Sequence, residues 1–331
     1  MYKISFCKRN DLQDLNLFLN KFWKKNHILV RDKNFFNWQH KRKSGYNFII
    51  TRHDNQIVGC VGVIANSVYS PRLINKDLLW LVNLVANKKY PGVGLKMLNF
   101  LQKNKKRNSI IGTVGCNNIS LNILKILGFQ TGTLSHYFIY NPQIKDPKII
   151  KLYDIKNIFK KKNFNIKNIN FREIKKIPRI KVNLSNKFRK DHSYLINKYF
   201  KHPIYKYSIF EMLKDGKKIG LFVTRNIRIK KRNIIRIVDY IGDLKNLTYL
   251  PSVIFDLVKK KNSEYADFFF NDNPKYKKHL KNFFENQYDK ENIIPNYFEP
   301  FVKKNIILNY AINTKKFIPI FKGDCDQDRP N

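Results

Sequence analysis

Two glycines stand two residues apart in a turn between an apolar stretch and a helical pattern. The sequence VNLVANKKYPGVGLKMLNFLQ (82–102) runs from an expected strand through Gly92 and Gly94 into apolar residues at helical spacing. A helix that begins there presents free backbone N–H groups and the positive end of its dipole, which together bind anions. Glycine leaves the main chain open to a phosphate because it has no Cβ. Three lysines add positive charge around the turn: Lys88, Lys89 and Lys96.

The glycine pair is also compatible with an ordinary tight turn that needs a positive φ. The dinucleotide pattern G-x-G-x-x-G does not continue after Gly94, and the chain has no Walker loop. The spacing therefore predicts a phosphate or diphosphate site of another kind.

The C-terminal sequence GDCDQDRPN reverses the charge of an otherwise basic chain. Asp324, Asp326 and Asp328 alternate with other residues and are followed by Arg329. Such a run is a solvated end in most proteins. Its two functional interpretations are docking of the tail on a basic groove and binding of a cationic amine.

The composition predicts a folded protein of two domains. The chain has 331 residues, 43% hydrophobic residues and a formal net charge of +41. This charge favours nucleic acid or an anionic surface as a partner. Lysines are nevertheless scattered among apolar residues, as in a chain of AT-rich coding origin, which favours background composition and attraction of small anionic ligands over a polyanion partner.

The cysteines and the apolar runs indicate whether the chain binds metal, forms disulfides or enters a membrane. Its four cysteines form no C-x-x-C pair and lie near no histidine set at zinc spacing, so free thiols and no metal site are expected. The N-terminus lacks the apolar core of a signal peptide, and no apolar run is long enough to span a bilayer. We expect a soluble cytoplasmic protein without a membrane span.

The first half alternates expected strands and helices that would position the glycine turn. Strands are expected at 2–7, 46–52, 56–65, 78–85, 109–114 and 134–140, and helices at 11–23, 94–105 and 120–127. The strands at 46–52 and 56–65 read as a hairpin, and Gly128 ends the last helix. This order predicts an α/β domain of the α+β kind with a mixed sheet.

The second half repeats the pattern weakly. After a Lys- and Asn-rich connection come a helix at 193–200, strands at 218–225 and 234–241, a helix at 250–260, and strands at 266–271 and 306–311. The similar order suggests a structural duplication. We expect a first domain at 1–142, a connecting region at 143–187 and a second domain at 188–331.

Two segments of the first half resemble the GNAT acyltransferases. KKYPGVG (88–94) is similar to the family's Q/R-x-x-G-x-G/A pyrophosphate loop, and GCNNISLNILKILGF (115–129) to its Asn followed by a short helix ending in Gly-Phe. The resemblance spans about residues 2–140. It implies an acyl-CoA cofactor, acetyl-CoA or another, whose pantetheine pairs with the strand at 78–85 and contacts Asn117. The implied diphosphate loop is Lys89, Tyr90, Gly92, Val93, Gly94 and Leu95.

Two positions depart from the family pattern. Lys89 stands where Gln or Arg is usual, which keeps the charge but changes the contact geometry. Leu124 stands where many members carry a Tyr thought to protonate the leaving thiolate. An active chain must therefore use another acid or solvent.

Acyl transfer to an amine needs a base and an oxyanion site. Backbone N–H groups of Leu84 or Val85 are the expected oxyanion donors. The base must take a proton from the incoming nitrogen. The catalytic candidates are His136, Asp239 and Asp243, with His202 in an aromatic setting as a fourth.

Each of these candidates also has a structural interpretation. His136 fits a buried sheet histidine, and His202 fits aromatic packing. Asp239 and Asp243 fit a pairing with Arg236 or a turn cap.

The second half resembles a GNAT-type domain without the glycine loop. Tandem pairs of this kind occur among N-acyltransferases of bacterial surface-polysaccharide synthesis, which act on amino groups of nucleotide-linked sugars. The sequence thus predicts an acyl-CoA-dependent N-acyltransferase with a small amine acceptor.

Two alternatives stay open. A Fem-like aminoacyl-tRNA-dependent transferase would account for the charge. A non-catalytic nucleic-acid-binding protein could stack bases on aromatics such as Phe35, Phe36 and Trp38, although FFNWQH is no recognised RNA-binding signature. The acyl group, the acceptor and the oligomeric state do not follow from the sequence.

Overall fold

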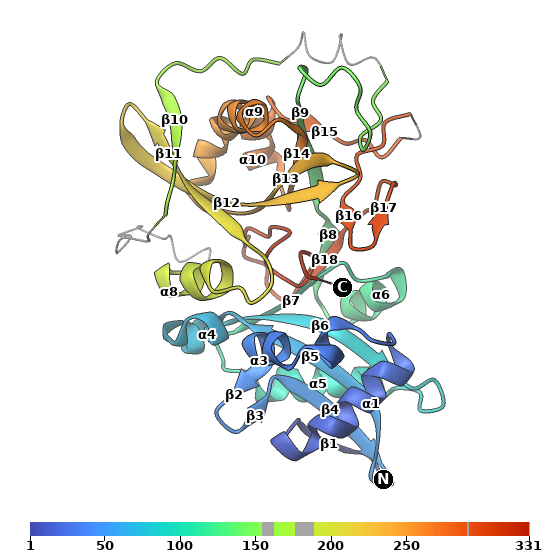
Figure 1. Ribbon diagram of the computed structural model, residues 1–331. Helices are drawn as coiled ribbons and strands as arrows, with labels where there is room; N and C mark the ends of the chain where they lie inside the picture. Colours follow the sequence, from blue (N-terminus) through green and yellow to red (C-terminus); the bar gives the residue numbers. More distant parts are fainter. Residues whose placement is uncertain (154–161, 176–188, 290, 331) are drawn as a thin grey trace.

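The chain folds into two lobes, each built on one seven-stranded mixed sheet. The computed structural model describes residues 1–153, 162–175, 189–289 and 291–330. The two lobes lie one above the other in Figure 1. The N-terminus lies at the base of the first lobe, and the C-terminal segment lies between the lobes. This arrangement confirms the α/β class and the duplicated architecture that the sequence predicts.

The first lobe contains most of the predicted elements within a few residues of their expected bounds. Its sheet has the order β1-β4-β5-β6-β7-β18-β8. The elements are β1 (Lys3–Phe6), α1 (Leu12–Phe22), β4 (Phe48–His53), β5 (Gln56–Ala65), β6 (Leu78–Ala86), α5 (Val93–Asn104), β7 (Ile110–Val114), α6 (Asn118–Ile126) and β8 (Gln130–Thr133). The sequence patterns do not predict α2 (Ile28–Arg31), α3 (Lys33–His40), α4 (Asn66–Tyr69), β2 (Lys41–Arg42), β3 (Gly45–Tyr46) and β8.

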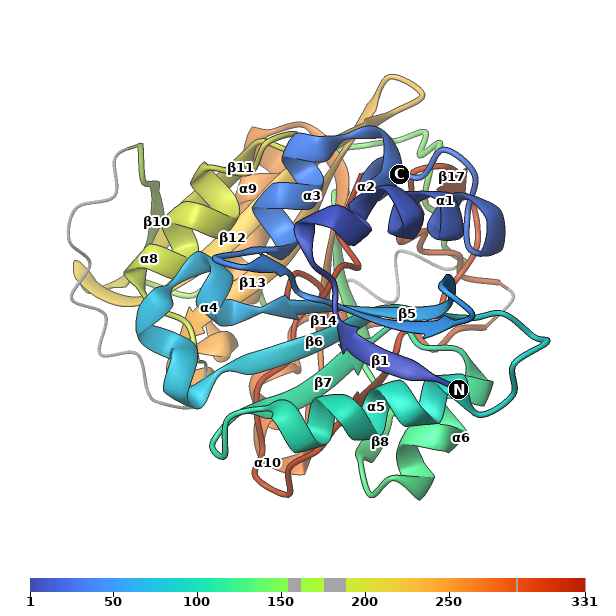
Figure 2. The ribbon, with the colours of Figure 1, turned by 90° about the horizontal axis from the view of Figure 1, so that it is seen from below.

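Alternating apolar side chains of the central hairpin bury both faces of this sheet. Successive strand residues point to opposite faces, so Ile49 joins the cluster beneath α5 and Ile50 joins the cluster beneath α1. Figure 2 shows α1, α2 and α3 on one face and α5 and α6 on the other. The β4–β5 turn uses Asp54 and Asn55 at φ 47° and 63°, a conformation that these residue types tolerate. The sheet therefore holds α5 and its glycine turn against a fully packed support.

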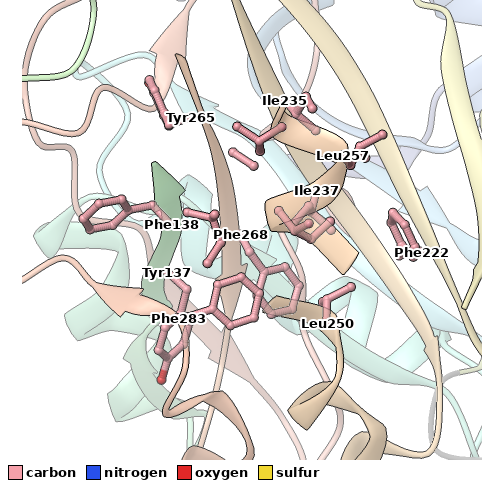
Figure 3. Packing of buried hydrophobic residues seen from close by; sticks show 14 of the residues in the cluster. Tyr137, Phe138, Phe222, Ile235, Ile237, Leu250, Leu257, Tyr265, Phe268 and Phe283 are labelled. Atoms are coloured by element: carbon pink, nitrogen blue, oxygen red, sulfur yellow. The ribbon is translucent and has the colours of Figure 1, made fainter. Parts of the chain in front are cut away.

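The second lobe repeats this architecture with the order β10-β11-β12-β13-β14-β9-β15. Its elements are β10 (Ile169–Glu173), α8 (His192–Leu195), η3 (Ile196–Phe200), β11 (Tyr207–Lys214), β12 (Lys217–Ile229), β13 (Arg232–Gly242), η4 (Leu244–Thr248), α9 (Leu250–Lys260), β14 (Ser263–Phe270), α10 (Pro274–Lys277) and β15 (Phe284–Glu285). Figure 3 shows its core, where Phe268 of β14 lies among Phe283, Ile237 and Leu250. The predicted helix at 250–260 has the same bounds in the structure.

The two lobes exchange one strand each. β9 (Ser135–Tyr140) pairs with β14 and β15 of the second sheet, and β18 (Asn309–Ile312) pairs with β7 and β8 of the first. The interpretation that the strand at 134–140 closes the first domain is therefore wrong, because its backbone partners belong to the other sheet. The strand at 306–311 likewise completes the first sheet.

The boundaries 1–142, 143–187 and 188–331 stay a prediction, with one modification inside the connecting region. β10 lies within that region and pairs with β11. Parts of the connecting region, 154–161 and 176–187, lie outside the described residues.

One hydrophobic cluster joins the lobes. It contains Trp80 and Val82 of β6, Val223 and Val238 of the second sheet, and Phe269 of β14. Buried apolar surface shared in this way makes rigid association of the lobes favourable. Among the described residues, no helix combines the length and hydropathy that crossing a membrane requires.

Candidate functional site

A cavity opens in the first lobe where two parallel strands diverge. β6 and β7 pair only from Leu78 to Trp80 and from Ile110 to Gly112. Beyond these residues β6 carries an irregularity in its pairing with β5, and Asn83 has a positive φ of 52°. A cavity of about 230 Å³ lies there. Its lining residues are Trp23, Leu81, Val82, Asn83, Leu84, Thr113, Val114, Gly115, Cys116, Asn117, Ser120, Leu124, Asp326, Gln327 and Arg329.

The glycine turn adjoins this cavity and is open to solvent. Gly92 caps α5 in the left-handed conformation at φ 78°, and a Cβ placed on it would meet no atom within 4 Å. A Cβ on Gly94 would meet only Leu84 Cδ1, at 3.9 Å, and Leu84 itself lines the cavity. The first intrahelical bond runs from Lys96 N–H to the carbonyl of Gly92, at 3.1 Å. The preceding amides of the helix are therefore available to an anion.

The lysines of the turn differ in their contacts. Lys88 and Lys89 are exposed, and the Lys89 backbone N–H donates to Asn87 Oδ1. The Lys96 ammonium lies 4.3 Å from the centroid of the Tyr2 ring. Tyr90 packs its ring against those of Tyr2 and His53. Lys89 thus lies exposed at the mouth of the turn, while Tyr90 packs the turn against Tyr2 and His53.

Asn83 is a site residue that the sequence analysis missed. Both its side-chain nitrogen and its side-chain oxygen are buried and have no hydrogen-bond partner among the described residues. An amide buried without a partner costs free energy, so the position suits a ligand that supplies both a donor and an acceptor. The signal in the sequence was an Asn inside the apolar strand LLWLVNLVA.

The two expected oxyanion donors, Leu84 and Val85, differ in their position relative to the cavity. Leu84 lines the cavity, whereas Val85 is buried and pairs with Cys60 of β5. Leu84 is therefore the better placed backbone donor of the two.

The residues after β7 form the opposite wall of the cavity. Asn117 is exposed, lines the cavity and caps α6, its Oδ1 accepting from Ser120 N–H at 2.9 Å. Leu124 is buried and lines the cavity, so the position faces the site but cannot donate a proton. Burial raises the pKa of the neighbouring Cys116 thiol to about 11.

The acidic tail is buried between the lobes, which confirms docking on basic side chains. The Lys190 ammonium bridges Asp239 and Asp324 at 2.7 and 2.6 Å. Asp328 pairs with Arg225 at 2.8 Å and with Arg236 at 3.4 Å. Although burial opposes it, these two guanidinium groups lower the pKa of Asp328 to about 2.

Asp239 is not in the cavity. It accepts from Lys190 and from the Tyr199 hydroxyl at 2.7 Å, and burial raises its pKa. The expected structural pairing with Arg236 is wrong, because Arg236 pairs with Asp267 instead. Asp239 therefore anchors the tail.

His136, Asp243 and His202 also lie apart from the cavity lining. His136 is fully buried in β9, stacks on Phe269, and has a pKa well below its usual value because of burial and two nearby cations. Asp243 caps η4 by accepting from Lys245 N–H at 3.0 Å. Burial lowers the pKa of His202 to about 4, and its ring stacks on Tyr205. The structural interpretation of each residue describes its position better than a catalytic one.

Comparison with known proteins gives matches in structure alone. No family model and no curated protein matches the sequence. A GCN5-related N-acetyltransferase from Anabaena variabilis matches with a TM-score of 0.55 at 8% identity, covering 94% of this chain and 72% of that one. A putative acetyltransferase from Pyrococcus horikoshii matches with a TM-score of 0.50 at 11% identity, covering 95% and 90%.

The chain has the GNAT fold. A GCN5-related N-acetyltransferase from Kribbella flavida, with a TM-score of 0.50 at 8% identity and coverage of 94% and 70%, agrees with this assignment. These matches extend over both lobes, so the GNAT fold accounts for the duplicated strand order as well as for the first lobe.

Proposed function

We propose that the chain is an N-acyltransferase that uses acetyl-CoA or another acyl-CoA to acylate an amine. The observation that carries this proposal is the cavity between the diverging strands β6 and β7, adjoined by a glycine turn that no side chain fills. The GNAT fold of the solved structures supports the same reaction class. The net charge of +41 also suits a nucleic-acid partner, but neither the tRNA-dependent nor the non-catalytic alternative accounts for the glycine turn beside this cavity.

The residues present fit an acyl-CoA. The amides of Gly92, Val93, Gly94 and Leu95, with Lys89, would hold the diphosphate at the positive end of α5. The orphan amide of Asn83 and the NH₂ of Asn117 would bond the pantetheine arm, which carries both amide donors and acceptors. An acyl-CoA supplies the activated thioester.

The chain's own groups would handle charge on the carbonyl oxygen. The Leu84 N–H would donate to the oxygen as negative charge develops, and the apolar lining of Leu81, Val82 and Leu124 would keep that interaction strong. Val85 stays the alternative donor. The acceptor class that the sequence suggests, an amino group on a nucleotide-linked sugar of polysaccharide synthesis, stays a prediction, and its phosphates would suit a net charge of +41.

Calorimetric titration with acetyl-CoA tests the proposal. The wild-type protein should bind one molecule per chain. Gly94→Leu should weaken binding by about 100-fold, or about 2.7 kcal/mol, because its side chain fills the space next to Leu84. The control is Asn99→Leu, which adds a similar side chain to an exposed position of the same helix. Equal affinity of the Gly94 variant, with unchanged thermal stability, would contradict the proposal.

A further inference from the structure

One carboxylate of the C-terminal tail lies across the opening between β6 and β7. Its two sequence neighbours each contact one of these strands beyond the region in which β6 and β7 pair. The Cys325 thiol donates to the carbonyl of Leu81 at 3.7 Å, and Gln327 Nε2 donates to the carbonyl of Val114 at 2.9 Å. Asp326, between them, therefore spans the gap and lines the cavity.

Asp326 is the single carboxylate among the described residues that line this cavity. The other titratable side chains there are Cys116 and Arg329. Cys116 holds its proton tightly, since burial raises its pKa to about 11, and a guanidinium stays cationic. Among the described residues of the lining, Asp326 is thus the one side chain that offers a carboxylate as a proton acceptor.

The neighbours of Asp326 hold its carboxylate in place. It is 8% exposed and pairs with Arg329, and its Oδ1 accepts from Gln327 Nε2 at 3.0 Å and from the Cys325 thiol at 3.6 Å. Arg329 in turn lies 5.3 Å from the centroid of the Trp23 ring, directly after α1. Charge-assisted hydrogen bonds of this kind hold a carboxylate in one orientation.

The tail and the glycine turn lie on different sides of the first sheet. Trp23 follows α1, on the face that α1, α2 and α3 cover in Figure 2, and the guanidinium of the tail residue Arg329 lies over its ring. The turn leads into α5, which covers the opposite face. A thioester and an amine could therefore enter the gap from opposite faces and meet near Leu84 and Asp326.

We infer that Asp326 binds the incoming amine and takes its proton during acyl transfer. This inference rests on the proposed function. The nitrogen lone pair of the neutral amine forms the C–N bond with the thioester carbonyl carbon, and the proton displaced from nitrogen passes to Asp326 Oδ. The C–S bond then breaks and its electron pair stays on the sulfur. The thiolate takes up the proton that Asp326 had accepted. The products are an amide and a thiol, and Asp326 is again a carboxylate.

The test compares transfer with donor binding in the full-length chain. Acetyl-CoA and a panel of primary amines (an amino sugar, a nucleotide-linked amino sugar, spermidine and an α-amino peptide) are assayed by release of free thiol. Asp326→Asn should lower kcat by about 100-fold or more while its acetyl-CoA affinity stays within about twofold of wild type. Asp326→Glu should restore part of the rate.

The control variant is Asp272→Asn in the second lobe. Asp272 accepts from Ser135 Oγ at 2.6 Å and Tyr137 Oη at 2.7 Å, away from the cavity, so this variant should keep its turnover. If wild type binds acetyl-CoA and acylates an amine but Asp326→Asn does so equally fast, the role of Asp326 is overturned and the proposed function stands. If wild type binds acetyl-CoA and acylates none of the amines, both are contradicted.

Discussion

The two lobes share a strand order but fill the equivalent gap differently. In the first lobe β6 and β7 separate around a cavity. In the second, β13 and β14 pair from Asn233 to Ile237 and from Ser263 to Phe268, and the chain's own tail fills the space beyond. Asn271 N–H donates to the carbonyl of Ile320 at 3.2 Å, and Gly323 N–H donates to the carbonyl of Val238 at 2.9 Å.

The lobe whose strands diverge around a cavity is the lobe that carries the glycine turn. Where the tail supplies the backbone partners that the separated strands need, no ligand is required to satisfy them. The second lobe accordingly has Asp243 after β13, where the first lobe has Asn87 after β6. A carboxylate at that point would repel a diphosphate. The second lobe thus holds the C-terminal tail in a position next to the cavity of the first lobe.

Removing the charge that fixes the tail should have the largest effect. Lys190→Met leaves Asp239 and Asp324 facing each other in a dry site, where burial already raises the pKa of Asp239. We expect a loss of about 3–5 kcal/mol in the free energy of unfolding, measured by urea denaturation.

Arg172→Ala provides the comparison for that variant. Its side chain is 71% exposed and pairs with Glu211, so we expect a change below about 1 kcal/mol. A Lys190 variant no less stable than the Arg172 variant would show that the tail is not held by this charge cluster.

Replacing a glycine by alanine should have opposite effects on stability at Gly323, in the second lobe's gap, and at Gly94, next to the first lobe's gap. A Cβ on Gly323 would lie 2.7 Å from the carbonyl oxygen of Val238, whereas a Cβ on Gly94 has 3.9 Å to its nearest neighbour. Gly323→Ala should therefore destabilise the protein by about 1–3 kcal/mol. Gly94→Ala, at a helical position, should be neutral or stabilising by up to about 1 kcal/mol. Thermal denaturation in the absence of ligand measures both, and similar losses would mean that the first gap is as tightly filled as the second.

The smallest effect concerns the amide that faces the cavity. Asn83→Gly keeps a residue that tolerates positive φ but removes the two unpartnered polar atoms. Acetyl-CoA affinity should fall about tenfold, while stability changes by less than about 1 kcal/mol.

Asn246→Gly in the second lobe is the matched control for this variant. Its amide donates to the carbonyl of Ile219 at 2.9 Å, so it should lose stability by about 1 kcal/mol and leave binding unchanged. Weaker binding in the control but not in the Asn83 variant would remove Asn83 from the site.

Local patterns in the sequence predicted the elements that lie next to each other along the chain. The hairpin of β4 and β5, the glycine turn and α5 each follow from alternation, turn residues and helical spacing within about twenty residues. The partners of β9 and β18 could not be predicted in this way, because both are short apolar strands that any buried sheet position accepts.

The site was predictable in part for the same reason. Gly92 and Gly94 could be recognised from one segment, whereas Asp326 meets β6 and β7 only through folding of the whole chain. The unusual charge of the tail was visible in the sequence, but its partners Lys190, Arg225 and Arg236 come from three other segments.

The reciprocal placement of β9 and β18 has a consequence for dividing the protein. A break between β9 and β10, at residues 141–168, leaves each fragment holding an inner strand that belongs in the other fragment's sheet. Neither piece can complete its own hydrogen-bond ladder, so the two fragments must be produced together and dock before either gains a finished sheet. Folding of the half that contains the glycine turn therefore depends on folding of the half that contains the C-terminal tail.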